Sequence, residues 1–362
     1  MKRCLPVIMA LCLLLSGCTN LLDGNYYSVQ PHEAQGGQNV STVVSAENYE
    51  QLRQILVNLA RNGVQSQVIF MPLYDQSKAD HDIRKAIREV MVRDPIGAFA
   101  IEEITYERGT SNGQAAVAVD LKYLHARSEI QKIQKIKDMD SAKKAITSAL
   151  DSCESGLVLY LENYETMDFV QFVENYAAEN PQKVMETPRV TAKAYPNLGA
   201  ERVVELRFSY QNSREDLRQM QEQVRPVFSS AVLFASGVEG QQQKYAQLYA
   251  FLMDFLMVQN DYKLETSITP AYSLLCHSVG DSKAFATVYA AMCAEVGLEC
   301  RVIAGTRRGE PWTWNQVCVD GSYYHVDLLR SGTEGAFQML SDGMMDGYVW
   351  NFSAHPKTAG AK

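Results

Sequence analysis

Three positions in the last third of the chain could together supply a nucleophile, a base and an orienting acid. Ser282 is expected to begin a helix, and Trp312 and Asp327 are expected on the two strands of a hairpin formed by residues 312–319 and 322–329. Nucleophilic acyl transfer uses such a placement. The residue types do not fit that chemistry, because an indole N–H cannot accept a proton. A helix terminus stabilises a charged Ser282 by at most about 2 kcal/mol, too little to ionise an alcohol without a base.

The predicted hairpin brings two of these positions together. Asp320-Gly321 is a strong signal for a two-residue turn between strands. If the residues that flank this turn are paired, Trp314 lies opposite Asp327, and Trp312 is its diagonal neighbour on the same face. The helix that begins near position 282 must supply the third group.

The segment from about 240 to 330 resembles a known family. Its most telling stretches read AYSLLCHSVGDSKAFATVYAAMCAEVGLECRVIAG and WTWNQVCVDGSYYHVDLL. They resemble the transglutaminase-like superfamily, which has the papain-related fold of transglutaminases and bacterial cysteine peptidases. Matched by position, the resemblance assigns the nucleophile, usually Cys, to Ser282, the base, usually His, to Trp312, and the acid to Asp327. The framing residues that match the family are Trp314, Asn315, Tyr324 and His325.

The two replacements favour a domain that keeps this fold and binds a ligand without catalysis. Trp312 would add an aromatic platform along the former substrate cleft, and an aromatic face near an Asp suits a peptide, protein, amine or cell-wall ligand. Three alternatives stay open: Trp312 only fills the cleft, Ser282 works as an acyl transferase or hydrolase with His325 or another base, or the chain delivers solute to a transporter. The ligand-binding candidates are Trp312, Trp314, Asn315 and His325.

The chain begins with the features of a lipoprotein signal peptide. MKRCLPVIMALCLLLSGC has a basic start, an apolar run, and Leu-Ser-Gly before Cys18. The run is too short for a spanning helix, which needs about 20 residues. We expect cleavage before Cys18 and a diacylglycerol, with fatty acids such as palmitate, on its sulfur, which places the chain on the extracytoplasmic face of a bacterial cell membrane. An ordinary secretory signal or a short buried helix is the alternative.

Charge and cysteine content narrow the possible partners. Loss of residues 1–17 removes two of the 34 basic residues and none of the 42 acidic ones, so the mature chain carries about −10. We therefore expect no nucleic-acid partner. No CxxC or Cys/His ligand spacing occurs, which predicts no disulfide framework, no metal and no cofactor.

The middle of the chain contains a predicted duplication. Residues 68–95 resemble 157–181, since each has an apolar strand before a helix that ends at a proline, and 116–134 resemble 202–221. The predicted fold class is α+β, with two tandem αβαββ repeats followed by a transglutaminase-like α+β domain. The predicted boundaries are 1–17 for the signal peptide, 18–43 for a flexible tether, 44–136 and 137–222 for the repeats, 223–349 for the transglutaminase-like domain and 350–362 for a tail.

Overall fold

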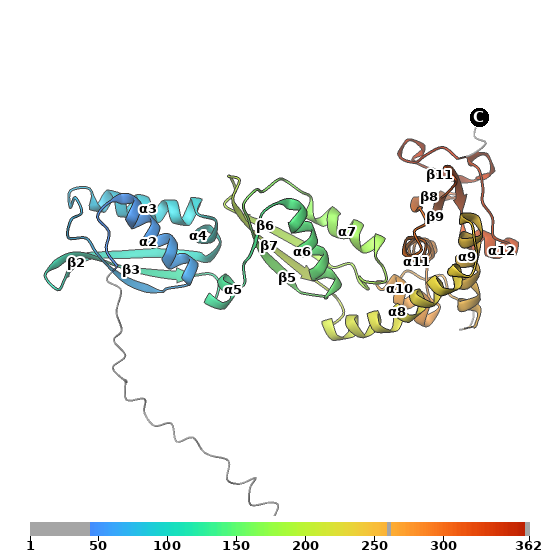
Figure 1. Cartoon of the computed structure of the whole chain (residues 1–362), viewed down its shortest axis with the longest axis horizontal. Helices are drawn as coiled ribbons and strands as arrows, with labels where there is room; N and C mark the ends of the chain where they lie inside the picture. Colours follow the sequence, from blue (N-terminus) through green and yellow to red (C-terminus); the bar gives the residue numbers. More distant parts are fainter. Residues whose placement is uncertain (1–43, 259–261, 359–362) are drawn as a thin grey trace, which may run out of the picture. The chain divides into compact units, whose positions relative to one another are not determined.

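The computed structural model describes residues 44–258 and 262–358 (Figure 1). The described residues have mixed α and β structure. Within the described ranges, every helix is too short or too polar to span a bilayer. The signal peptide and the predicted lipidation at Cys18 lie outside the described residues.

The first module is a three-stranded antiparallel sheet with helices packed on it. Its strand order is β1-β3-β2. Asn48 starts the first helix by accepting a hydrogen bond from the backbone N–H of Gln51, and Gly63 ends it with a φ of 62°. The elements are α2 (Tyr49–Asn62), β1 (Ser66–Phe70), α3 (Ala79–Arg93), α4 (Pro95–Ala100), β2 (Ile101–Ser111) and β3 (Gln114–Tyr123).

Pro95 begins a helix here. We expected the second helix of this module to close before Pro95, and α3 does end at Arg93, but α4 starts directly after it. Asp94 caps α4 by accepting a hydrogen bond from the backbone N–H of Gly97 at 2.8 Å. Proline suits the first helical position because its missing N–H would have no helical partner there.

The second module is a four-stranded sheet in the order β4-β5-β7-β6. The short β4 runs parallel to β5, and the other neighbours are antiparallel. One face of the sheet packs on the apolar sides of α6 and α7, around Ile146, Leu159 and Val173. The elements are α5 (Arg127–Gln131), β4 (Gln134–Ile136), α6 (Met139–Asp151), β5 (Gly156–Leu161), α7 (Phe169–Glu179), β6 (Arg189–Tyr195) and β7 (Arg202–Ser209).

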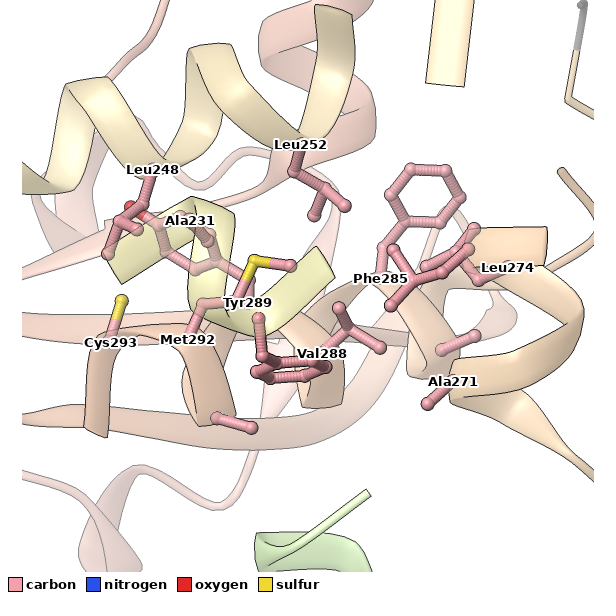
Figure 2. Close-up of a cluster of buried hydrophobic side chains, with 14 of the residues drawn as sticks. Ala231, Leu248, Leu252, Ala271, Leu274, Phe285, Val288, Tyr289, Met292 and Cys293 are labelled. Carbon is pink, nitrogen blue, oxygen red and sulfur yellow. The ribbon is translucent and has the colours of Figure 1, made fainter. Parts of the chain in front are cut away.

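The C-terminal part combines five helices with a four-stranded sheet in the order β10-β9-β8-β11. Its core surrounds the long helix α11, whose inner side chains Phe285, Tyr289 and Met292 meet Leu252 of α9 and Leu274 of α10 (Figure 2). The elements are α8 (Arg214–Ser236), α9 (Gln241–Val258), α10 (Pro270–His277), α11 (Ser282–Glu295), β8 (Cys300–Arg307), β9 (Glu310–Val319), β10 (Ser322–Val326), α12 (Leu328–Glu334) and β11 (Tyr348–Trp350).

The segment after α12 returns to the sheet and closes it. β11 pairs with the edge of β8, while Leu340 forms a bridge to His325 on the opposite edge strand, β10. Thr358, within the predicted tail, bridges to Tyr323 of the same strand. A second core forms under this segment around Trp314, with Leu340 and Trp350 among its members. We call residues 336–358 the closing segment.

Candidate functional site

Ser282 lies at the start of α11. Asp281 caps the helix, since its side-chain oxygen accepts a hydrogen bond from the backbone N–H of Ala284 at 2.9 Å. Ser282 is the first helical residue and is only 9% exposed. Its Oγ accepts a hydrogen bond from the backbone N–H of Thr313 at 3.1 Å. The hydroxyl therefore ties the helix start to β9, one residue from Trp312.

The β9–β10 hairpin sets the distance between the other two positions. Its turn residues, Asp320 and Gly321, have φ values of 49° and 79°, the positive values that a type I′ turn requires. The strands pair from Ser322 opposite Val319, which confirms the predicted register. This register brings Trp312 next to the end of β10.

Asp327 lies where the second strand gives way to a helix. β10 ends at Val326 and α12 begins at Leu328, so the prediction of a strand through residue 329 is wrong at its end. The Asp327 side chain explains the change, because its Oδ1 accepts hydrogen bonds from the backbone N–H groups of Leu329 and Arg330 at 3.1 and 3.2 Å. A carboxylate in this position satisfies N–H groups that a helix start leaves unpaired.

The other carboxylate oxygen of Asp327 accepts hydrogen bonds from two aromatic side chains. Oδ2 accepts from the indole Nε1–H of Trp312 at 2.9 Å and from the hydroxyl of Tyr348 at 2.5 Å. Burial, and then the hydrogen bond to Asp327, raise the pKa of Tyr348, so its hydroxyl stays a donor. Asp327 is 2% exposed and accepts four hydrogen bonds. Trp312 thus presents an N–H to the acid, as an imidazole in that position would.

Arg307 adds a positive charge beside this aromatic pair. Its guanidinium carbon lies 5.1 Å from the ring centroid of Trp312 and 5.4 Å from that of Tyr348. Its Nη1 is 3.5 Å from Oδ2 of Asp327. Trp312 is partly buried.

The other three ligand-binding candidates face the interior. Trp314 donates from Nε1 to Nδ1 of His325 at 3.0 Å, and Nε2 of His325 lies 2.9 Å from Oδ1 of Asp342. Because Nδ1 accepts, the proton of the neutral ring is on Nε2 and is donated to Asp342. Burial lowers the pKa of His325, and the hydrogen bond to Asp342 opposes this only in part. Asn315 is fully buried and donates to the carbonyl oxygen of Ala286 at 2.9 Å.

Ser282 has no imidazole partner in the described part of the chain. Its hydroxyl makes one hydrogen bond there, to the backbone N–H of Thr313. His325 is bonded to Trp314 and Asp342, and the ring of His277 packs edge-on against Tyr272 with 5.0 Å between centroids. The arrangement therefore gives the hydroxyl no side-chain base.

The space between Ser282 and Asp327 is small. It is too small to hold a water molecule, so an acyl group does not fit between the hydroxyl and the acid in this conformation. Across residues 44–258 and 262–358, no group of three or more His, Cys, Asp or Glu side chains could hold a metal ion. The residues that line the space are Ser282, Phe285, Ala286, Thr313, Trp314, Asn315, Asp327, Leu328 and Leu329.

Sequence reasoning missed three residues of this site: Arg307, Asp342 and Tyr348. Arg307 stands at the end of β8 and reaches the site across the β8–β9 pair. Tyr348 and Asp342 come from the closing segment, whose return to the sheet has no local signal. Three side chains of this segment, Met345, Tyr348 and Trp350, are buried.

Comparisons with known proteins agree with the resemblance in the sequence. The sequence model of the transglutaminase-like superfamily matches residues 233–328, which contain Ser282, Trp312 and Asp327. No curated protein matches the chain.

Two solved structures are similar at a low level. One is a "TGase", at 10% identity over 61% of this chain and 63% of that one, with a TM-score of 0.26. The other is a "Putative Cysteine Protease" from Cytophaga hutchinsonii, at 12% identity over 42% and 65% of the two chains, with a TM-score of 0.24. The chain covers less than two thirds of either, and scores this low carry no argument about fold or function. The family match stands by itself: residues 233–328 form a domain of the transglutaminase-like superfamily.

Proposed function

We propose that this chain is a membrane-anchored surface lipoprotein whose transglutaminase-like domain binds a ligand and does not catalyse. The observation that carries the proposal is the hydrogen bond from Nε1 of Trp312 to Asp327, in the place where a base would be oriented by its acid. An imidazole has a second nitrogen that can take the proton of the nucleophile. An indole has none, so Trp312 satisfies the acid and leaves Ser282 without a base.

The small space beside Ser282 supports the same proposal. Its Oγ already accepts a backbone hydrogen bond, and the space beside it is too small for water. Hydrolysis needs a water molecule at the acyl group, and transamidation needs an amine there. Neither fits into this space beside the wild-type hydroxyl in this conformation.

Ligand binding is proposed for Trp312. Of the four candidates named from the sequence, Trp314, Asn315 and His325 are buried, and Trp312 is only partly buried. Exposed aromatic rings beside a charged group are common anchors for peptides and proteins. The competing proposal is that Trp312 only fills the former cleft, in which case Trp312→Ala would leave all binding unchanged.

We further infer that the two modules before this domain are tandem copies of an αβαββ unit. The helix, strand, helix, strand, strand order of α2, β1, α3, β2 and β3 recurs in α6, β5, α7, β6 and β7. The strand orders β1-β3-β2 and β5-β7-β6 also correspond. α4 and β4 are then additions specific to one copy each. The role that we propose for the pair is to space the last domain from its anchor.

The non-catalytic proposal is tested by an activity assay that compares the wild type with a variant expected to gain activity. The full chain, purified in a mild nonionic detergent, is assayed for ammonia release from a glutamine-containing peptide and for peptide hydrolysis. We expect no turnover from the wild type and measurable turnover from a Ser282→Cys, Trp312→His variant, because these substitutions restore a thiol and a proton acceptor beside Asp327. Each single variant is a matched control and should stay silent. Turnover by the wild type that Ser282→Ala abolishes would overturn the proposal.

A further inference from the structure

Two cysteines of the C-terminal domain lie at the two ends of one short loop. Cys293 is near the end of α11, and Cys300 begins β8. The loop is tight, because the carbonyl oxygen of Cys293 accepts hydrogen bonds from the backbone N–H groups of Val296 and Leu298 at 3.2 and 2.9 Å. Gly297 allows this turn with a φ of 74°. The chain thereby returns to the helix end just before Cys300.

The strand register turns the Cys300 side chain toward α11. Cys300 pairs with Val317 of β9, which is fully buried in the core that also contains Cys293. Paired residues of an antiparallel sheet have their side chains on the same face. Cys300 is therefore on the face that α11 covers, and it packs against this core. Figure 2 shows Cys293 beside Met292, among the core side chains of α11.

The two thiols are neighbours in this core. Cys293 is 0% exposed, whereas Cys300 is partly buried. Burial, and then a hydrogen bond with the Cys300 thiol, raise the pKa of Cys293. A disulfide requires that both side chains point toward each other, and this contact meets that requirement. In this structure both residues are free thiols.

Cys318 is near Cys300 along the sheet but has its side chain on the other face. It pairs with Tyr323 of β10, and its backbone N–H donates to the carbonyl oxygen of Glu299 at 3.2 Å. Because it follows Val317 directly in β9, its side chain points away from the face that holds Cys300. The register therefore favours Cys293 over Cys318 as the partner of Cys300.

We propose that Cys293 and Cys300 form a disulfide when the chain meets an external disulfide such as oxidised glutathione. The step is thiol–disulfide exchange. The thiolate of Cys300, the less buried of the two, attacks one sulfur of the external disulfide and releases one thiol. The sulfur of Cys293 then attacks that of Cys300 and releases the second thiol. Two protein thiols are oxidised, the external disulfide is reduced, and the two protons end on the released thiols.

The bond would join the helix that begins at Ser282 to the sheet that carries Trp312. A cross-link of this kind limits the unfolded chain and so stabilises the fold around the site. The inference goes beyond the proposed function, and only its setting depends on it, since the proposed anchor would hold the chain where disulfides persist. No C-x-x-C spacing marks this pair, which is why the sequence predicted no disulfide.

The test is a peptide map of the folded full chain, in nonionic detergent, after treatment with oxidised glutathione. Remaining thiols are alkylated in denaturant, and the chain is digested with trypsin without reductant. Trypsin cleaves after Lys283 and Arg301, so both cysteines fall in the peptide 284–301. We expect this peptide to carry no alkyl group and to be lighter than its reduced form by two hydrogen atoms. Further cleavage after Glu295 and Glu299 should leave its two cysteine fragments joined.

Cys318→Ala is the matched control, because it removes a thiol from the same sheet and should leave the closed peptide unchanged. Cys293→Ala should prevent closure, and the map of the wild type decides the question if that variant does not fold. Two alkyl groups on residues 284–301, glutathione retained on Cys300 of the wild type, or a link between Cys300 and Cys318 would each overturn the inference. Neither ligand nor turnover enters this measurement, so its result is independent of the assay above.

Discussion

At the scale of single residues, His325 is a buried histidine whose two ring nitrogens are both hydrogen-bonded. Nδ1 accepts from Trp314 and Nε2 faces Asp342. Protonation of Nδ1 would place a second N–H against that of the indole and would break this bond. The groups that act on its charge are Asp342, which favours the protonated ring, and His355, which disfavours it together with burial.

This arrangement predicts that acid destabilises the C-terminal domain. Burial lowers the pKa of His325 below its usual 6.5, so the stability it contributes is complete above pH 6.5 and is lost as the pH falls toward the folded-state pKa. Between pH 6.5 and the folded-state pKa, His325 is protonated in the unfolded chain and still neutral in the folded chain. Urea unfolding followed by the fluorescence of Trp314 and its neighbours should give a lower midpoint at pH 5.5 than at pH 7.5. His325→Gln should reduce that difference, and an equal pH dependence in both proteins would contradict the assignment.

The residues of the site differ in how far the sequence could predict them. Trp312 and Asp327 could be placed side by side because a two-residue Asp-Gly turn fixes the register of everything that follows it. Ser282 could be placed at a helix start because the capping residue is its immediate neighbour. The sequence could not place Arg307 and Tyr348 near Asp327. Their approach to it depends on tertiary contacts between strands and on the return of the closing segment.

At the scale of elements, β11 pairs with β8 at a position that only glycine fits. Gly305 pairs with Trp350 of β11 and with Trp312 of β9. A Cβ at this position would collide with the carbonyl oxygen of Val349 and would lie 2.9 Å from the ring of Trp314. The absent side chain thus lets β11 and the Trp314 ring approach β8 closely.

Gly305→Ala should therefore loosen β11 and lower the free energy of unfolding by about 1–3 kcal/mol, as overpacking of a core does. Urea unfolding monitored by tryptophan fluorescence measures the loss. Gly109→Ala on β2 is the control, since an added Cβ there meets nothing within 4 Å. The account fails if the two substitutions have the same effect.

The sequence predicts the ends of helices and strands well where a Gly or Pro marks them. It predicts them less well where a side-chain hydrogen bond sets the boundary. Gly63 ends α2 and Pro270 opens α10, and both residue types are local signals for these positions. The end of β10 was misplaced because Asp327 reads as a strand residue in a HVDLL pattern, yet its carboxylate caps the next helix. Pro95 was expected only to stop a helix, although the Asp before it allows another to begin.

At the scale of the whole molecule, the anchor remains a prediction from the first eighteen residues. Cys18→Ser should abolish incorporation of radiolabelled palmitate in a bacterial host and should shift the chain from the membrane fraction to the soluble fraction, because a thioether-linked lipid needs the sulfur. Cys153→Ser is the matched control, since Cys153 is a buried free thiol in the second module. Equal labelling of wild type and Cys18→Ser would rule out this anchor.

The closing segment has a consequence for the order in which the chain can fold during its synthesis. The family match ends at residue 328, but Trp314 is covered by Leu340, Tyr348 and Trp350, which the ribosome makes later. The two N-terminal modules can each complete their own sheets as soon as they emerge. The last domain cannot cover Trp314 until residue 350 is available, so it is the last part of the chain that can complete its fold.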